Sequence, residues 1–134
     1  MSLEILQRER EEVLILDLNG RITVGDEAAA LRDTLREFSA AGRRNFILNL
    51  QEVGYIDSTG LGAMVVCFTS VRQMGGKLKL ENLNRRNIQL LVVTKLTTVF
   101  EIFNDEQDAV NSFFPDREIK RFDILSFVTE QTGE

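Results

Sequence analysis

Five segments of the chain have the apolar patterns of β-strands. Some alternate apolar and polar residues and others form short apolar blocks, and we predict strands over residues 3–8, 12–18, 45–50, 77–83 and 99–103. The first two are short neighbours, which favours an antiparallel pair at a sheet edge. The Asn19-Gly20 pair is a turn signal and is expected to end the second strand. The block at 45–50 is continuously apolar, as in a central strand covered by helices.

Between these strands the apolar period changes to that of helices. Ala28, Leu31, Leu35 and Phe38 recur at helical spacing, with acidic residues in the first turn and Gly42 as a C-terminal cap. Three further helices are expected. They run from about Thr59 to Met74, from an Asn84 cap through Ile88, Leu91 and Val92 to about Leu96, and from an Asn104 or Asp105 cap to the only proline, Pro115.

The resulting order is ββαβαβαβα, and repeated strand–helix–strand crossovers build an α/β fold with a small, mostly parallel sheet and four α-helices. We expect residues 1–114 to form one domain and residues 115–134 to be a C-terminal extension. The extension has a moderate amphipathic pattern, carried by Ile119, Phe122, Leu125 and Val128. This pattern favours a short helix that docks on the domain or on a second copy, with frayed terminal residues as the alternative.

Composition removes several classes of function. The chain has 134 residues, 43% of them hydrophobic, and a net charge of −5, and it contains no histidine. Without histidine, the commonest general base and zinc ligand is missing. The single cysteine, Cys67, lies among apolar neighbours and is expected to be buried. We therefore expect neither a metal nor a cofactor.

Charge and hydropathy also restrict the partners. Residues 1–103 balance 13 acidic against 13 basic side chains, and residues 104–134 supply the excess with 8 against 3. No basic stripe with interleaved aromatic residues is present, so direct nucleic-acid binding is not expected. The apolar runs are too short to span a bilayer and the N-terminus has no signal-peptide pattern, so we expect a cytoplasmic protein without membrane association.

One short motif lies where the predicted topology places binding sites. The run YIDSTGLG, residues 55–62, follows the central strand and enters a helix, and open sheets bind ligands and partners at that end. Ser58 falls at or beside the helix N-cap, where serine is also favoured for purely structural reasons. Gly60 and Gly62 are poor helix residues, and in the first turn they leave room for another surface to approach.

Known catalytic motifs do not fit this run. A nucleophile elbow needs glycine two residues before the serine, where Ile56 stands, and a histidine elsewhere. Thr59 interrupts the triplet of aspartic proteases, and a phosphate-binding loop would end in lysine. A hydroxyl presented at a helix start without catalytic groups suits the substrate of a kinase better than it suits an enzyme.

Taken together, residues 45–83 (NFILNLQEVGYIDSTGLGAMVVCFTSVRQMGGKLKLENL) resemble the bacterial anti-sigma factor antagonist family, whose domain is called STAS. The strand, the Asp-Ser-Thr-Gly-Leu-Gly motif, the Gly-Gly turn and the next strand follow in family order. The resemblance covers roughly Leu3 to Phe114 and implies the same fold that the patterns predict.

The resemblance also implies a function. An anti-sigma factor that is a serine kinase would phosphorylate Ser58, the unphosphorylated form would bind that kinase and free sigma factor, and a phosphatase would reset the switch. The remaining motif residues would shape this site: Asp57, Thr59, Gly60, Leu61 and Gly62. A turn at Gly20-Arg21-Ile22 matches a neighbouring partner-binding loop. Thr23 stands where relatives often carry aspartate, and Asp26 is the candidate substitute.

We therefore predict a binding module switched by phosphorylation, not an enzyme. Two other hypotheses share the same domain: a STAS scaffold or sensor-complex protein, and a soluble STAS partner of a membrane transporter. For an enzyme or a nucleotide-binding protein the sequence offers no residues. A homodimer is left open.

Overall fold

The structure is a computed structural model that describes residues 3–119. Its elements follow the predicted order: β1 Glu4–Arg10, β2 Val13–Ile22, α1 Asp26–Ala40, β3 Asn45–Ile56, α2 Ser58–Gln73, β4 Lys77–Glu81, α3 Arg85–Val93, a 3₁₀ turn Leu96–Thr98, β5 Ile102–Phe103 and α4 Glu106–Asn111. The strands form a single sheet in the order β1-β2-β3-β4-β5. Only β1 runs antiparallel to its neighbour, which confirms the predicted edge pair and the mostly parallel sheet.

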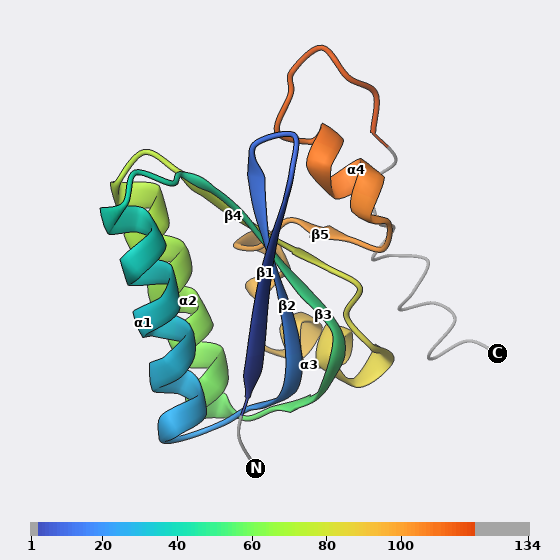
Figure 1. The fold of residues 1–134 in the computed structure, drawn as a ribbon. Helices are drawn as coiled ribbons and strands as arrows, with labels where there is room; N and C mark the ends of the chain where they lie inside the picture. The colour runs from blue at the N-terminus through green and yellow to red at the C-terminus, as the bar shows by residue number, and fades with distance from the viewer. Residues whose placement is uncertain (1–2, 120–134) are drawn as a thin grey trace, which may run out of the picture.

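The helices cover the sheet unequally. Helices α1 and α2 lie side by side along one face, and α4 lies at the other end of the sheet, beside the β1–β2 hairpin (Figure 1). The largest core contains Leu14, Leu16 and Leu18 of β2 together with apolar residues of α1, α2 and α3. A smaller core joins the alternate β2 residues Val13 and Ile15 to α4. Successive side chains of β2 point to opposite faces of the sheet, so the strand contributes to a separate core on each face.

The main departure from the predicted elements is at Asn19-Gly20. Strand β2 does not turn there but continues to Ile22, in register with β3 up to Ile56. Register shifts on either side of Asn19-Gly20, together with a φ of 129° at Gly20, mark a bulge in the strand. The glycine that indicated a turn instead bends a strand that goes on, and the predicted Gly20-Arg21-Ile22 turn is wrong.

Several further boundaries differ. Strand β3 continues past residue 50 to Ile56, β4 ends at Glu81 instead of residue 83, and α4 ends at Asn111, before Pro115. The last strand spans only Ile102–Phe103, because the 3₁₀ turn and the chain after it occupy the start of the predicted segment. Helix α3 ends at Val93, and Lys95 takes a left-handed φ of 64°. In the extension, Ile119 packs against the smaller core. Phe122, Leu125 and Val128 lie outside the described residues, so the docking helix and the domain boundary at residue 115 stay predictions.

A polar cluster lies between the sheet and α4, and we call it the α4 cluster: Arg8, Asp17, Asn49, Glu81 and Glu106. The Nε of Arg8 pairs with Asp17 at 2.6 Å, and its terminal nitrogens bond Glu106. The Nδ2 of Asn49 donates to Asp17 at 2.7 Å. Glu81 is fully buried, and neither of its carboxyl oxygens has a hydrogen-bond partner. The strict alternation of β4 therefore directs a carboxyl group into the protein rather than into water.

Within residues 3–119, no helix is both long enough and apolar enough to cross a bilayer.

Candidate functional site at the start of helix α2

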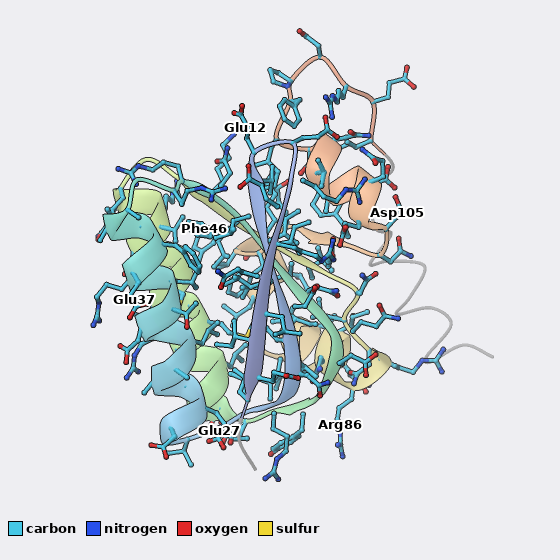
Figure 2. The ribbon with its side chains drawn as sticks, viewed as in Figure 1. Glu12, Glu27, Glu37, Phe46, Arg86 and Asp105 are labelled. Carbon is cyan, nitrogen blue, oxygen red and sulfur yellow. The ribbon has the colours of Figure 1, made fainter. Side chains whose placement is uncertain are left out.

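The motif lies where β3 passes into α2, beside the link from β2 to α1. Both links leave the carboxyl ends of adjacent parallel strands and reach the same end of the molecule (Figure 1). Sites of open α/β sheets form at such ends. Figure 2 places Glu27, in the first turn of α1, at this end, whereas Glu12 of the β1–β2 hairpin lies at the opposite end.

Asp57 is the N-cap of α2 and ties the two links together. Its Oδ1 accepts a hydrogen bond from the Gly60 N–H at 2.7 Å, which satisfies one of the free donors of the first helical turn. Its Oδ2 accepts from the Val24 N–H at 3.2 Å, across the gap to the β2–α1 link. The Asp57 N–H in turn donates to the Ile22 carbonyl at 3.2 Å. The segment before Ser58 is thus fixed by backbone contacts and by both carboxylate oxygens.

The two motif glycines have different roles. A Cβ on Gly60 would lie 1.8 Å from the Ile22 carbonyl oxygen, so only glycine lets α2 approach β2 this closely. A Cβ on Gly62 would have no neighbour within 4 Å. The space that we expected both glycines to leave for a partner is, at Gly60, already filled by the protein's own strand.

Ser58 and Thr59 are the first two residues of α2, and both are exposed. The N-cap is therefore Asp57, and Ser58 stands beside it. At the positive end of the helix dipole an anionic group is stabilised by about 0.3–1 kcal/mol. Among residues 3–119 no group of three or more Asp, Glu or Cys side chains is placed to hold a metal. The Ser58 hydroxyl is accessible to another protein.

The other predicted site residues divide by exposure. Ile22 and Leu61 are buried in the main core and support the site from beneath. Arg21 and Asp26 are exposed. The Thr23 hydroxyl donates to Glu27 at 3.4 Å, so this side chain belongs to the start of α1.

A separate groove of about 320 Å³ lies between α1 and α2, lined by residues that include Arg36, Val66, Cys67 and Met74 but not Ser58. Burial raises the pKa of the Cys67 thiol to about 11, so the thiol is not an activated nucleophile. This confirms the buried cysteine that the apolar neighbours predicted.

The site residues predicted from the sequence leave out three exposed residues, one at the start of the motif and two beside it. Val24 and Tyr55 are large, partly apolar and 64% and 41% exposed, and Arg86 of α3 stacks on the Tyr55 ring. Val24 directly follows the predicted site residue Thr23, and Tyr55 begins the YIDSTGLG run two positions before Asp57, so closeness in the sequence was the available signal. Arg86 could not have been found this way, because only the fold brings α3 to β3.

Comparisons with known proteins define the class first. The family model for the STAS domain matches residues 4–109. Among solved structures, a candidate anti-sigma factor antagonist of Thermotoga maritima superposes with a TM-score of 0.75 at 25% identity, covering 81% of this chain and 92% of that one. The Bacillus cell fate determinant SpoIIAA in its phosphorylated form gives a TM-score of 0.64 at 15% identity, over 82% and 99% of the two chains, and shows likeness of fold.

A curated relative narrows the class. The anti-sigma-B factor antagonist of Bacillus subtilis is 35% identical over 102 residues, which are 76% of this chain and 92% of the relative. The chain belongs to the bacterial anti-sigma factor antagonist family of STAS domain proteins, as the motif and its flanking strands predicted.

Proposed function

We propose that this chain is an anti-sigma factor antagonist controlled by phosphorylation of Ser58, and a binding module rather than an enzyme. The unphosphorylated form binds an anti-sigma factor kinase and thereby releases sigma factor in the cytoplasm. The kinase transfers phosphate to Ser58, which ends the interaction, and a phosphatase restores the hydroxyl. The Bacillus subtilis relative is named for antagonism of an anti-sigma factor, and this supports the class of partner.

The observation that carries the proposal is the contrast between Asp57 and Ser58. The Asp57 carboxylate accepts a backbone hydrogen bond at each of its oxygens, so it positions the segment. Ser58 is exposed at the first residue of α2. An exposed hydroxyl on an ordered helix start, without its own base, depends on another protein for its chemistry.

The fold is expected to tolerate the phosphate, and the interface is not. Phosphorylation adds about −1.5 to −2 charges. The phosphate would stand beside the Asp57 carboxyl group, and two like unit charges about 4 Å apart near a protein surface repel by about 4 kcal/mol. The positive end of the α2 dipole offsets about 0.3–1 kcal/mol of this repulsion. In solution water screens the rest. A bound partner would remove that water and leave a double charge unpaired.

The test measures affinity for the purified anti-sigma factor kinase by titration calorimetry. We expect phospho-Ser58 and Ser58→Asp to bind at least about tenfold more weakly than the unmodified protein, about 1.4 kcal/mol. Ser58→Ala should bind normally and stay bound when ATP is added. Equal affinity of all four forms would refute the switch.

Thr59→Ala is the matched control for the phosphorylation site, since Thr59 is the equally exposed neighbour. With kinase and ATP, this variant should still take up one phosphate, and Ser58→Ala should take up none. Mass spectrometry that finds the phosphate on Thr59 would assign the switch to the wrong hydroxyl.

A further inference from the structure

A surface next to Ser58 combines apolar, aromatic and basic side chains, and we call it the Tyr55 patch: Arg21, Val24, Tyr55 and Arg86. Tyr55 lies opposite Arg21 in the register of β2 and β3. The guanidinium carbon of Arg86 stands 5.5 Å from the centre of the Tyr55 ring, within the range of a cation–π contact. The patch therefore joins residues from β2, the β2–α1 link, β3 and α3.

The patch is held in place by backbone contacts. Asn84 caps α3 by accepting from the Asn87 N–H at 2.8 Å, and its Nδ2 donates to the Val53 carbonyl at 3.2 Å. The Nδ2 of Asn87, which is almost fully buried, donates to the same carbonyl at 2.9 Å. These bonds attach the start of α3 to β3 two residues before Tyr55. Arg86 is thus positioned over the ring by its helix.

The patch is continuous with the phosphorylation site. The Val24 N–H donates to the Asp57 carboxylate at the start of α2. The exposed Val24 side chain is therefore held close to Ser58. Figure 2 shows Arg86 at the same end of the molecule as Glu27, at the start of α1. This end therefore carries acidic side chains on α1 and basic ones on β2 and α3.

Within the part of the chain that the structure describes, the guanidinium groups of the patch pair with no carboxylate. Several other arginines do, as in Arg8 with Asp17, Arg43 with Glu9 and Arg117 with Glu11. Within residues 3–119 neither Arg21 nor Arg86 forms an ion pair. Tyrosine and arginine are the residue types that most often dominate binding energy at protein interfaces. An exposed tyrosine and valine flanked by unpaired guanidinium groups fit a partner with carboxylates around an apolar contact.

We infer that the Tyr55 patch is the second half of the partner-binding surface and takes an acidic, partly apolar face of the anti-sigma factor kinase. This rests on the proposed function and adds which residues choose the partner. Ser58 supplies the part of the interface that phosphorylation changes. The patch supplies affinity and charge selection that do not depend on the Ser58 hydroxyl.

The test compares charge reversals within the Tyr55 patch with a charge reversal at the far end of α2. Arg86→Glu and Arg21→Glu should each weaken binding of the purified kinase at least about tenfold, because a like charge would face the partner's carboxylates. Arg72→Glu is the matched control, since Arg72 is an exposed arginine in the last turn of α2, away from Ser58. It should stay within about twofold of the unmodified protein. Added salt should lower the affinity of the unmodified protein for the kinase more than it lowers the affinity of the Arg86→Glu variant.

A second pair of variants tests the ring. Tyr55→Phe keeps the face on which Arg86 stacks and should bind nearly as well as the unmodified protein. Tyr55→Ala removes it and should bind about tenfold more weakly, with circular dichroism confirming that both variants fold.

The outcomes separate the two proposals. Binding that Ser58 phosphorylation abolishes but that Arg86→Glu and Tyr55→Ala leave unchanged would overturn the patch and keep the proposed function. No binding by the unmodified protein would overturn both. A changed solution mass of Arg86→Glu alone, without the kinase, would show that the patch contacts a second copy and would also overturn the inference.

Discussion

Asp57 and Glu81 stand at the carboxyl ends of neighbouring parallel strands, yet their carboxyl groups meet opposite surroundings. Asp57 follows β3 and accepts from two backbone N–H groups. Glu81 ends β4, is fully buried, and its oxygens have no hydrogen-bond partner. Where backbone donors are free, at a helix start, a carboxyl group can accept from them and organise a surface. Where the carboxyl group is buried and a second acid is its neighbour, as at Glu81, it keeps its proton.

The charge states of the α4 cluster follow from this difference. Burial is the largest cause that raises the pKa of Glu81 to about 9, and the neighbouring Glu106 carboxylate raises it further. Hydrogen bonds from Arg8 are the main cause that lowers the pKa of Glu106 to about 2. Glu106 thus carries the charge and Glu81 the proton near pH 7. The Asp57 carboxyl group organises the site end through two backbone N–H donors, whereas Glu81 holds its proton beside Glu106 of α4.

The largest expected effect comes from breaking the close contact between Gly60 of α2 and the Ile22 carbonyl of β2. Gly60→Ala would place a Cβ 1.8 Å from the Ile22 carbonyl oxygen, so α2 or β2 has to move. We expect a loss of about 3 kcal/mol in the free energy of unfolding, measured by urea denaturation. Gly62→Ala is the matched control, with open space around its Cβ and an expected gain of up to about 1 kcal/mol. Equal effects of the two changes would contradict the close approach.

The second largest expected effect is a dependence of stability on pH that comes from Glu81. The folded state holds a proton on Glu81 that the unfolded chain releases above its ordinary pKa of 4.5. Stability therefore falls as pH rises from about 4.5 to about 9. Glu106 acts oppositely but only below 4.5, where its lowered pKa costs stability as pH falls. Glu81→Gln mimics the protonated acid and should raise stability at pH 8 by about 1–3 kcal/mol.

Melting curves across pH 5 to 9 check this prediction, and the Glu81→Gln protein should have the flatter profile. Glu37→Gln, at an exposed position on α1, is the control and should follow the unmodified protein. If Glu81→Gln keeps the original slope, Glu81 does not hold its proton in the folded state.

The smallest expected effect comes from removing the Asp57 hydrogen bonds to Val24 and Gly60. Asp57→Ala removes the N-cap bond to Gly60 and the bond to Val24, and should cost about 1 kcal/mol of stability. Asp57→Asn keeps an acceptor for one N–H and should cost less. Hydrogen exchange at the Val24 and Gly60 amides gives the local readout: both should exchange faster in Asp57→Ala, and unchanged rates would contradict the link.

The sequence predicts most of the fold because local patterns control most of it. Helical spacing predicts α1, the YIDSTGLG run and the Gly75-Gly76 pair bound α2, and the Asn84 and Asp105 caps mark the starts of α3 and α4. The error at Asn19-Gly20 arose because a glycine with positive φ serves a turn and a bulge equally well. Pairing with β3 beyond the bulge decides between them, and that pairing is tertiary.

The candidate site was predictable in place but not in detail. The motif locates Ser58, yet Gly60 and Gly62 look equivalent until Ile22, far earlier in the chain, is seen opposite one of them. Likewise the alternation in KLKLE predicts the strand but not the burial of its polar residues Lys79 and Glu81. The coverage by α4 that buries them comes from residues that follow β4 by more than twenty positions.

The double acceptance by Asp57 also bears on the speed of partner exchange. A segment already fixed to Val24 and Gly60 has little conformational entropy left to lose when a partner docks. Association then needs no folding step, and we expect rate constants of about 10⁵–10⁷ M⁻¹s⁻¹. The lifetime of each complex is then set by dissociation, so under the proposed switch a phosphate on Ser58 is expected to act mainly by raising the dissociation rate of the partner.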